Sequence, residues 1–224
     1  MIVNKLKNIV RIKKEKEELE FQYNWVNYDW NHLMMCLHNY WKKYRYYGEI
    51  IDLIQPQGKR ILDVGCGVMS FMNLICSNEG EFFGIDPLMD DYKSLYTTDS
   101  RVKWLQSKGE RLPFDSNYFD VVVCSNVLDH VEKPNIVMQE ISRVLKSSGR
   151  LLLTVDIFKE KVVRDAAHPH CFMEKDVNDL LKNNFEILFS KKSELRAQIM
   201  LYVKKQTMTS DKAQEIIILA EKRG

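Results

Sequence analysis

The chain has 224 residues, of which 45% are hydrophobic, and its formal net charge at pH 7 is +2. A chain of this length and composition can bury one sizeable core and is most simply a single domain. No stretch approaches the roughly 20 uninterrupted apolar residues of a membrane span, and the first residues show no apolar core with a cleavage site, so secretion is not expected. Five cysteines with no Cys-x-x-Cys pair are typical of reduced thiols in a cytoplasmic protein.

Residues 1–57 precede the first strand signal and are expected to be helical, because residues 1–20 carry apolar side chains at helical spacing. Residues 21–47 interleave aromatic and basic side chains, which leaves three interpretations. The rings pack helices onto the core, they form a lid or cap over a substrate, or they stack on nucleic acid or a membrane surface. The rings are Trp25, Tyr28, Trp30, Tyr40, Trp41, Tyr44, Tyr46 and Tyr47.

From residue 60 onward, strand and helix signals alternate. Strands are expected at 60–64, 82–86, 101–106, 119–124 and 150–156, with helices at 69–79, 88–97 and 134–147. Alternation of this kind predicts an α/β fold with a parallel sheet and helices on both faces. The fold class is therefore a Rossmann-like, doubly wound, mostly parallel sheet.

The end of the chain breaks this alternation. After a helix at 174–184, two apolar runs at 185–191 and 198–204 have no helix between them, so a terminal antiparallel hairpin is expected. Residues 207–224 are predicted to form a last helix that begins near Asp211 and docks on the domain or on a partner. The predicted organisation is thus a segment 1–57, a core 58–206 and a helix 207–224.

A nucleotide site is predicted where the first strand ends, at Gly65-Cys66-Gly67. Glycine there allows a sharp turn and a close approach of ligand to backbone. Asp86 follows the second strand, where a carboxylate can accept hydrogen bonds from a ribose; its alternative role is to begin a turn before Pro87. NAD is disfavoured because Ser70 occupies the third glycine position of the pyrophosphate motif. A nucleoside without a pyrophosphate, such as S-adenosylmethionine, fits better.

Six short blocks follow one another between about residues 58 and 156. They read ILDVGCG (61–67), GID (84–86), ERLPF (110–114), FDVV (119–122), SNVLDHV (125–131) and EISRVLK with GRLLL (140–153). Together they resemble the class I S-adenosylmethionine-dependent methyltransferases, and more narrowly the small-molecule branch that includes ubiquinone-biosynthesis enzymes. The segment HPHCF (168–172) extends the resemblance weakly.

The resemblance implies which residues bind the cofactor S-adenosylmethionine. Gly65 and Gly67 would contact the methionine end of the cofactor, and Asp63 would orient its amino group. Asp86 would hold the ribose hydroxyls. Two positions depart from the family, since Met69 replaces a further glycine and Lys108 replaces an acidic residue that reads adenine. The implied cofactor-binding residues are Asp63, Gly65, Cys66, Gly67, Asp86, Pro87, Gly109, Glu110, Ser125, Asn126 and His130.

The acceptor is expected to be a small molecule, with a hydroxyl, an amine or a carbon as the methylated atom. A hydroxyl acceptor needs a base, for which His168 and His170 are the candidates. No metal site is expected, because His168, His170 and Cys171 lack a second ligand cluster. Nucleic acid is not expected as a partner, and a homodimer is an open alternative. The competing hypothesis is a non-catalytic scaffold of the same fold, which only Met69 and Lys108 favour.

Overall fold

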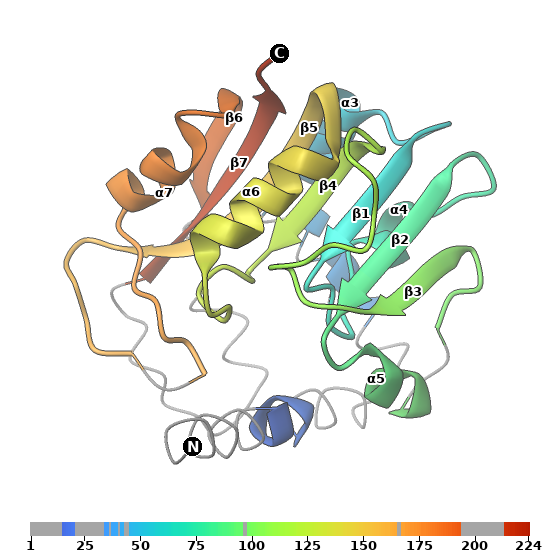
Figure 1. Cartoon of the computed structure of the whole chain (residues 1–224), viewed down its shortest axis with the longest axis horizontal. Helices are drawn as coiled ribbons and strands as arrows, with labels where there is room; N and C mark the ends of the chain where they lie inside the picture. Colours follow the sequence, from blue (N-terminus) through green and yellow to red (C-terminus); the bar gives the residue numbers. More distant parts are fainter. Residues whose placement is uncertain are drawn as a thin grey trace.

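A computed structural model describes residues 15–20, 34–35, 37–39, 41–42, 45–95, 98–164, 167–193 and 213–224. Its centre is a seven-stranded sheet with the strand order β3-β2-β1-β4-β5-β7-β6 (Figure 1). The neighbouring pairs from β3 to β5 are parallel, and β7 runs antiparallel to both β5 and β6. The predicted α/β, mostly parallel sheet with a terminal antiparallel pair is confirmed.

The five parallel strands lie close to their predicted positions. They are β1 (Arg60–Val64), β2 (Glu81–Asp86), β3 (Val102–Gln106), β4 (Phe119–Ser125) and β5 (Leu145–Phe158). The middle strands are buried on both faces, as their continuous apolar runs require. Strand β5 begins five residues earlier than predicted, because helix α6 ends at Val144 and the chain becomes extended before the expected Gly149 stop.

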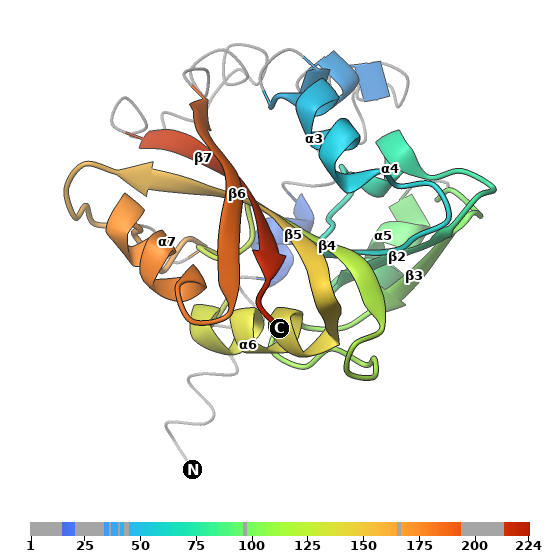
Figure 2. The same ribbon diagram turned by 90° about the horizontal axis from the view of Figure 1, so that it is seen from above.

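Helices cover both faces of the sheet (Figure 2). One face is covered by α6 and α7, and the other by α3 and α4, each through its own hydrophobic cluster. The predicted helix at 69–79 is reduced to a single turn, α4. The helices are α3 (Tyr47–Ile54), α4 (Met72–Ile75), α5 (Met89–Leu95), α6 (Pro134–Val144) and α7 (Glu174–Leu181).

The predicted C-terminal helix at 207–224 is wrong for every described residue of that range. Residues Ala213–Lys222 form strand β7, which lies between β5 and β6 (Phe185–Ser193). The consecutive β-branched residues Ile216, Ile217 and Ile218 explain this outcome, since a central strand buries both of its faces whereas a surface helix buries only one. The antiparallel partner of β6 is thus β7, and the expected strand at 198–204 lies outside the described residues.

The N-terminal segment contributes both to the core and to the surface above the site. Trp41 is 1% exposed and its ring centroid lies 4.4 Å from that of Phe71, so this ring packs into the core. The helical residues 15–20 lie on the side to which the carboxyl ends of β1, β2 and β4 point (Figure 1). The rings of Trp25, Tyr28, Trp30, Tyr40 and Tyr44 lie outside the described residues.

The order of the strands reverses between β1 and β4. The chain leaves β1 toward β2 and β3 on one side, and later returns to β4 and β5 on the other. Ligands of open α/β sheets bind beyond the carboxyl ends of the strands at such a point. Within the described residues no helix is both long and apolar enough to cross a bilayer.

Candidate functional site

The loop after β1 turns through two glycines with left-handed backbone. Gly65 has φ +67° and Gly67 has φ +52°. A Cβ at Gly65 would lie 2.5 Å from Cγ2 of Val127, in the turn after β4. Glycine is therefore required both by the backbone and by the close approach of that turn, which brings the ends of β1 and β4 together.

Asp63 orders this loop from beneath. Its carboxylate is 2% exposed, and its Oδ2 accepts hydrogen bonds from the Ser70 hydroxyl at 2.6 Å and the Phe71 backbone N–H at 2.9 Å. Burial raises the pKa of Asp63 to about 7, although both hydrogen bonds act in the opposite direction. Ser70, the residue that breaks the NAD motif, thus anchors the loop to the strand.

Asp86 lies where β2 ends and holds the same loop from the other side. It is 8% exposed; its Oδ2 accepts from the Gly67 backbone N–H at 3.1 Å and its Oδ1 from the Leu88 N–H at 2.9 Å. Burial raises the pKa of Asp86 to about 6. A carboxylate held in place by backbone amides is pre-oriented for a further hydrogen-bonding partner. Pro87 follows it and is exposed.

The segment after β3 bears on the two adenine candidates. A Cβ at Gly109 would lie 3.2 Å from side chains of Val64 and Val137, so this backbone is packed close to the end of β1. Glu110 Oε1 accepts from the backbone N–H groups of Glu132 and Lys133, at 3.0 and 3.3 Å. Glu110 is therefore fixed to the start of α6 through its side chain.

Lys108 and Met69, the two residues that depart from the family pattern, each contact neighbouring side chains. Lys108 Nζ lies 3.8 Å from Glu132 Oε1 in an exposed ion pair, so its charge is turned toward that carboxylate. Met69 and Leu19 of the N-terminal helix both pack against the hydrophobic cluster of the glycine loop. The cluster consists of Cys66, Val68, Leu88, Met89 and Tyr92.

The end of β4 is connected to the N-terminal segment and to β7 by a buried polar network. Ser125 Oγ lies 2.9 Å from Arg45 Nη1 and 3.0 Å from Thr154 Oγ1. Arg45 also makes a two-point ion pair with Glu215, with Nε–Oε2 at 3.0 Å. Asn126, the next residue, has φ +57°, a backbone conformation that functional sites often retain.

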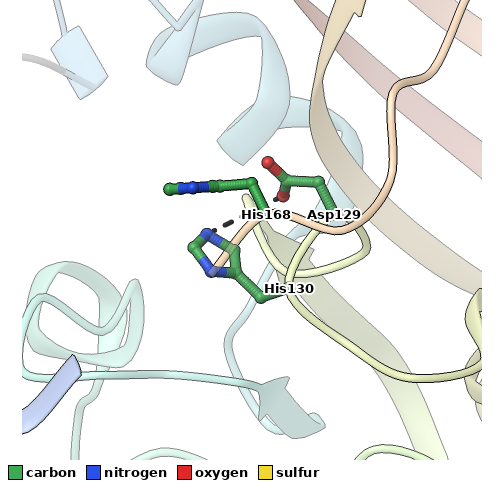
Figure 3. Close-up of side chains that lie close together, drawn as sticks. All are labelled: Asp129, His130 and His168. Carbon is green, nitrogen blue, oxygen red and sulfur yellow. Dashed lines mark ion pairs between the residues drawn. The ribbon is translucent and has the colours of Figure 1, made fainter. Parts of the chain in front are cut away.

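Beyond Asn126, the turn after β4 meets the loop after β5. His130 and His168 pack with ring centroids 4.3 Å apart, and Asp129 lies beside them (Figure 3). His170 is separate from this pair, because its Nε2 lies 2.8 Å from the carbonyl oxygen of Val131. Of the two predicted bases, His168 is therefore grouped with His130, and His170 is tied to the backbone.

Sequence reasoning missed the charged residues of this side. Asp129 is 1% exposed, and Arg164 donates to its Oδ2 at 2.7 Å. Arg45 and Glu215 were also missed, because their pairing joins positions that lie far apart in the sequence. The only available signal was Asp129 itself, a charged residue within an apolar block next to His130.

The glycine loop and the two buried carboxylates thus lie together at the switch point of the sheet. Residues 62–153 match a family model described as a methyltransferase domain. The chain therefore contains a domain of the methyltransferase family over residues 62–153, and relatives of the chain are named as methyltransferases. S-adenosylmethionine is the cofactor of this family.

Relatives of this methyltransferase include quinone-pathway enzymes. It is 29% identical over 126 residues to the ubiquinone/menaquinone biosynthesis C-methyltransferase of Ruegeria sp., a match that covers 52% of this chain and 48% of the relative. It is 27% identical over 165 residues to the demethylmenaquinone methyltransferase of Staphylococcus carnosus, with 67% and 66% covered. The chain thus spans half to two thirds of these relatives.

The fold is also that of a solved methyltransferase structure. A crystal structure of an S-adenosylmethionine-dependent methyltransferase from Methanosarcina mazei superposes with a TM-score of 0.60 at 22% identity. The superposition covers 78% of this chain and 97% of the other. At this identity the likeness concerns the fold.

Proposed function

We propose that the methyltransferase transfers a methyl group from S-adenosylmethionine to a small-molecule acceptor that binds on the β4–β5 side of the switch point. The observation that carries the proposal is Asp86 at the end of β2, which is buried and oriented by the backbone amides of Gly67 and Leu88. A ribose diol donates to such a carboxylate. The cofactor-binding set predicted from the sequence belongs to this proposal.

The hydrogen-bonding groups around the glycine loop are compatible with this cofactor. Gly65 and Gly67 have left-handed backbone beside Asp86. Asp63 lies in β1 and orders the loop through the hydrogen bond that its carboxylate accepts from Ser70. The adenine would lie along the backbone near Gly109, since Glu110 is occupied with the start of α6. When bound, the sulfonium supplies an activated methyl group, so the protein chiefly aligns the reactants and excludes water.

The acceptor side is proposed to lie under the N-terminal segment. Arg45 joins this segment to Ser125 at the end of β4, and Leu19 packs against the glycine-loop cluster. Two separate contacts of one segment with the two sides of the site support the interpretation of residues 1–57 as a cap. Because Trp41 is buried in the core, the same segment also packs onto the domain, which was the alternative interpretation of its aromatic rings.

His168 is proposed to contact the acceptor or to accept its proton. Its ring is half-buried and belongs to the loop after β5, beside His130. Imidazole titrates near neutrality and can take a proton from a hydroxyl as the methyl–oxygen bond forms. His170 holds the same loop through the Val131 carbonyl, so we assign it a positioning role.

The test is a search for methylated products. The full chain is incubated with methyl-labelled S-adenosylmethionine and fractions of cellular small molecules, and mass spectrometry detects compounds that gain one labelled methyl group. The proposal expects a labelled product that depends on the protein and is lost in the Asp86→Ala variant. Cofactor binding without any labelled product would favour the non-catalytic scaffold, and failure to bind the cofactor would contradict the proposal outright.

A further inference from the structure

Three possible metal ligands converge where the turn after β4 meets the loop after β5. Asp129, His130 and His168 each offer one ligand atom, and these atoms all lie within 4.8 Å of one another (Figure 3). His130 Nε2 lies 3.8 Å from Asp129 Oδ1, which is too long for a hydrogen bond. The three side chains come from two segments that are distant in sequence, so no spacing motif reveals them.

The Asp129 carboxylate provides an independent indication of a cation. The residue is 1% exposed, and Arg164 satisfies only its Oδ2. The other oxygen, Oδ1, is buried and has no hydrogen-bond partner among the described residues. A buried carboxylate oxygen without a partner is costly, and this one is directed toward the two imidazoles. A bound cation would satisfy it.

We propose that Asp129, His130 and His168 form a binding site for one divalent transition-metal ion of the zinc class. Two imidazoles and one carboxylate are the ligands that such ions prefer. With metal–ligand bonds of about 2.0–2.2 Å, tetrahedral ligand atoms lie roughly 3.4 Å apart. The ligand atoms lie at most 4.8 Å apart, and His130 Nε2 is 3.8 Å from Asp129 Oδ1, so small side-chain rotations can bring them to this spacing.

Arg164 sets the strength expected of the site. Its guanidinium holds the carboxylate through the oxygen that the ion does not need, as outer hydrogen bonds of metal ligands commonly do. Its positive charge also opposes the ion, so binding is weaker than in a structural zinc site. Three protein ligands leave a fourth position open, the arrangement of metal sites that engage a substrate.

The chemical consequence rests on the proposed function. With His168 bound to the ion, this residue would contact the acceptor through the metal and would no longer serve as the base. An acceptor hydroxyl oxygen in the open position would have a lowered pKa and would lose its proton to water. Its lone pair then forms the new C–O bond as the C–S bond of the sulfonium breaks, and that electron pair remains on sulfur. The site therefore selects an oxygen acceptor over a carbon or an amine.

Metal binding is measured on the full-length protein without cofactor or acceptor. The chain is treated with a chelator and titrated with Co²⁺, followed by visible absorption, and with Zn²⁺, followed by calorimetry. The wild type is expected to bind one ion, and His168→Ala to lower the affinity at least about tenfold. His38→Ala, which removes an exposed histidine outside the cluster, is the matched control and is expected to leave the affinity unchanged. Circular dichroism establishes that each variant is folded.

Three outcomes would overturn the metal site: no saturable binding by the wild type, equal binding by His168→Ala, or an equal loss in His38→Ala. Asp129→Asn provides a second ligand variant, and unchanged binding there also counts against the site. Affinity for S-adenosylmethionine is measured in parallel and is expected to be the same with and without His168. A protein that binds the cofactor but no metal refutes this inference alone, whereas one that binds metal but no cofactor refutes the proposed function.

Discussion

The loops after β1 and β2 differ from the loops after β4 and β5 in how their buried charges are satisfied. On the first side, the carboxylates of Asp63 and Asp86 accept hydrogen bonds from backbone amides and a hydroxyl that lie 2 to 19 residues away in the sequence. On the second side, Arg45 with Glu215 and Arg164 with Asp129 pair across 170 and 35 residues. The proposed cofactor side is therefore built from residues closer in sequence than those of the proposed acceptor side.

This difference explains why residues on the first side can be predicted from the sequence more readily than those on the second. A strand, two glycines and an acidic residue form a local pattern, because the same few residues must turn the chain and meet the ligand. The acceptor side has no such constraint, and substrates vary where loops vary. Substitutions that disturb one side at a time test whether the two sides differ in this way.

Removing Arg45 tests the acceptor side. Arg45→Ala leaves the buried Glu215 carboxylate without its main partner, so the free energy of unfolding should fall by about 3–5 kcal/mol. Chemical denaturation measures it. Lys182→Ala, which breaks an exposed pair with Asp179, is the control and should change little. Equal effects of the two variants would show that the Arg45 network does not hold the segment.

The pH dependence of stability tests the cofactor side. The Asp63 pKa is about 7 in the folded protein and 3.8 in its ordinary state, so the folded chain binds the extra proton between these values. Stability should therefore fall as the pH rises from about 4 to about 7. Asp63→Asn keeps an oxygen acceptor for Phe71 but cannot ionise, and it should flatten this decline by at most about 4 kcal/mol. Urea denaturation at pH 5 and pH 8 measures the difference, and an unchanged slope would contradict the assignment.

Two glycines with similar backbones separate strain from contact. A Cβ added at Gly65 (φ +67°) or Gly58 (φ +71°) would strain the left-handed backbone at either position. Of the two, only a Cβ at Gly65 would have a neighbour within 4 Å, Val127. Gly58→Ala should cost roughly 1–2 kcal/mol of stability, and Gly65→Ala should cost more and weaken cofactor binding. Adding Val127→Ala to Gly65→Ala should restore part of the loss. Equal costs for the two single variants would show that the close approach is unimportant.

Asp129→Asn is expected to leave the affinity for S-adenosylmethionine almost unchanged. The substitution removes the charge that pairs with Arg164, but it touches neither Gly67 nor Leu88, the partners of Asp86. Cofactor affinity should therefore change less than about twofold, well under the tenfold that corresponds to 1.4 kcal/mol. Calorimetry at constant pH measures it. A tenfold loss would show that the two sides are coupled.

Much of the fold could be predicted from the sequence, and the errors have physical causes. The parallel strands were found because buried runs such as residues 61–64 are flanked by turn residues. Residues 213–222 were assigned to a helix because a capping pattern precedes them, yet their isoleucines fill the centre of the sheet. A local signal cannot report that β6 would be an edge strand needing β7 as its neighbour.

The candidate site divides in the same way. Asp86 and the two glycines can be singled out from the sequence, and they lie at adjacent strand ends; their roles in cofactor binding stay a prediction. Asp129, Arg164 and the pairing of His130 with His168 depend on the meeting of two loops, which only the three-dimensional arrangement shows. Asp63 was expected to orient the cofactor, and in the structure its carboxylate orders Ser70 and Phe71.

The most direct test of the central claim is the calorimetric affinity of the full chain for S-adenosylmethionine, compared between the wild type and Asp86→Ala. The variant loses charge-assisted hydrogen bonds worth about 1.5–3 kcal/mol each, so its dissociation constant should rise at least tenfold while circular dichroism stays unchanged. Asp90→Ala, an exposed acidic residue of α5 that pairs with Lys93, is the matched control and should bind as the wild type does. The same dissociation constant for the wild type and Asp86→Ala would contradict the placement of the cofactor at the ends of β1 and β2.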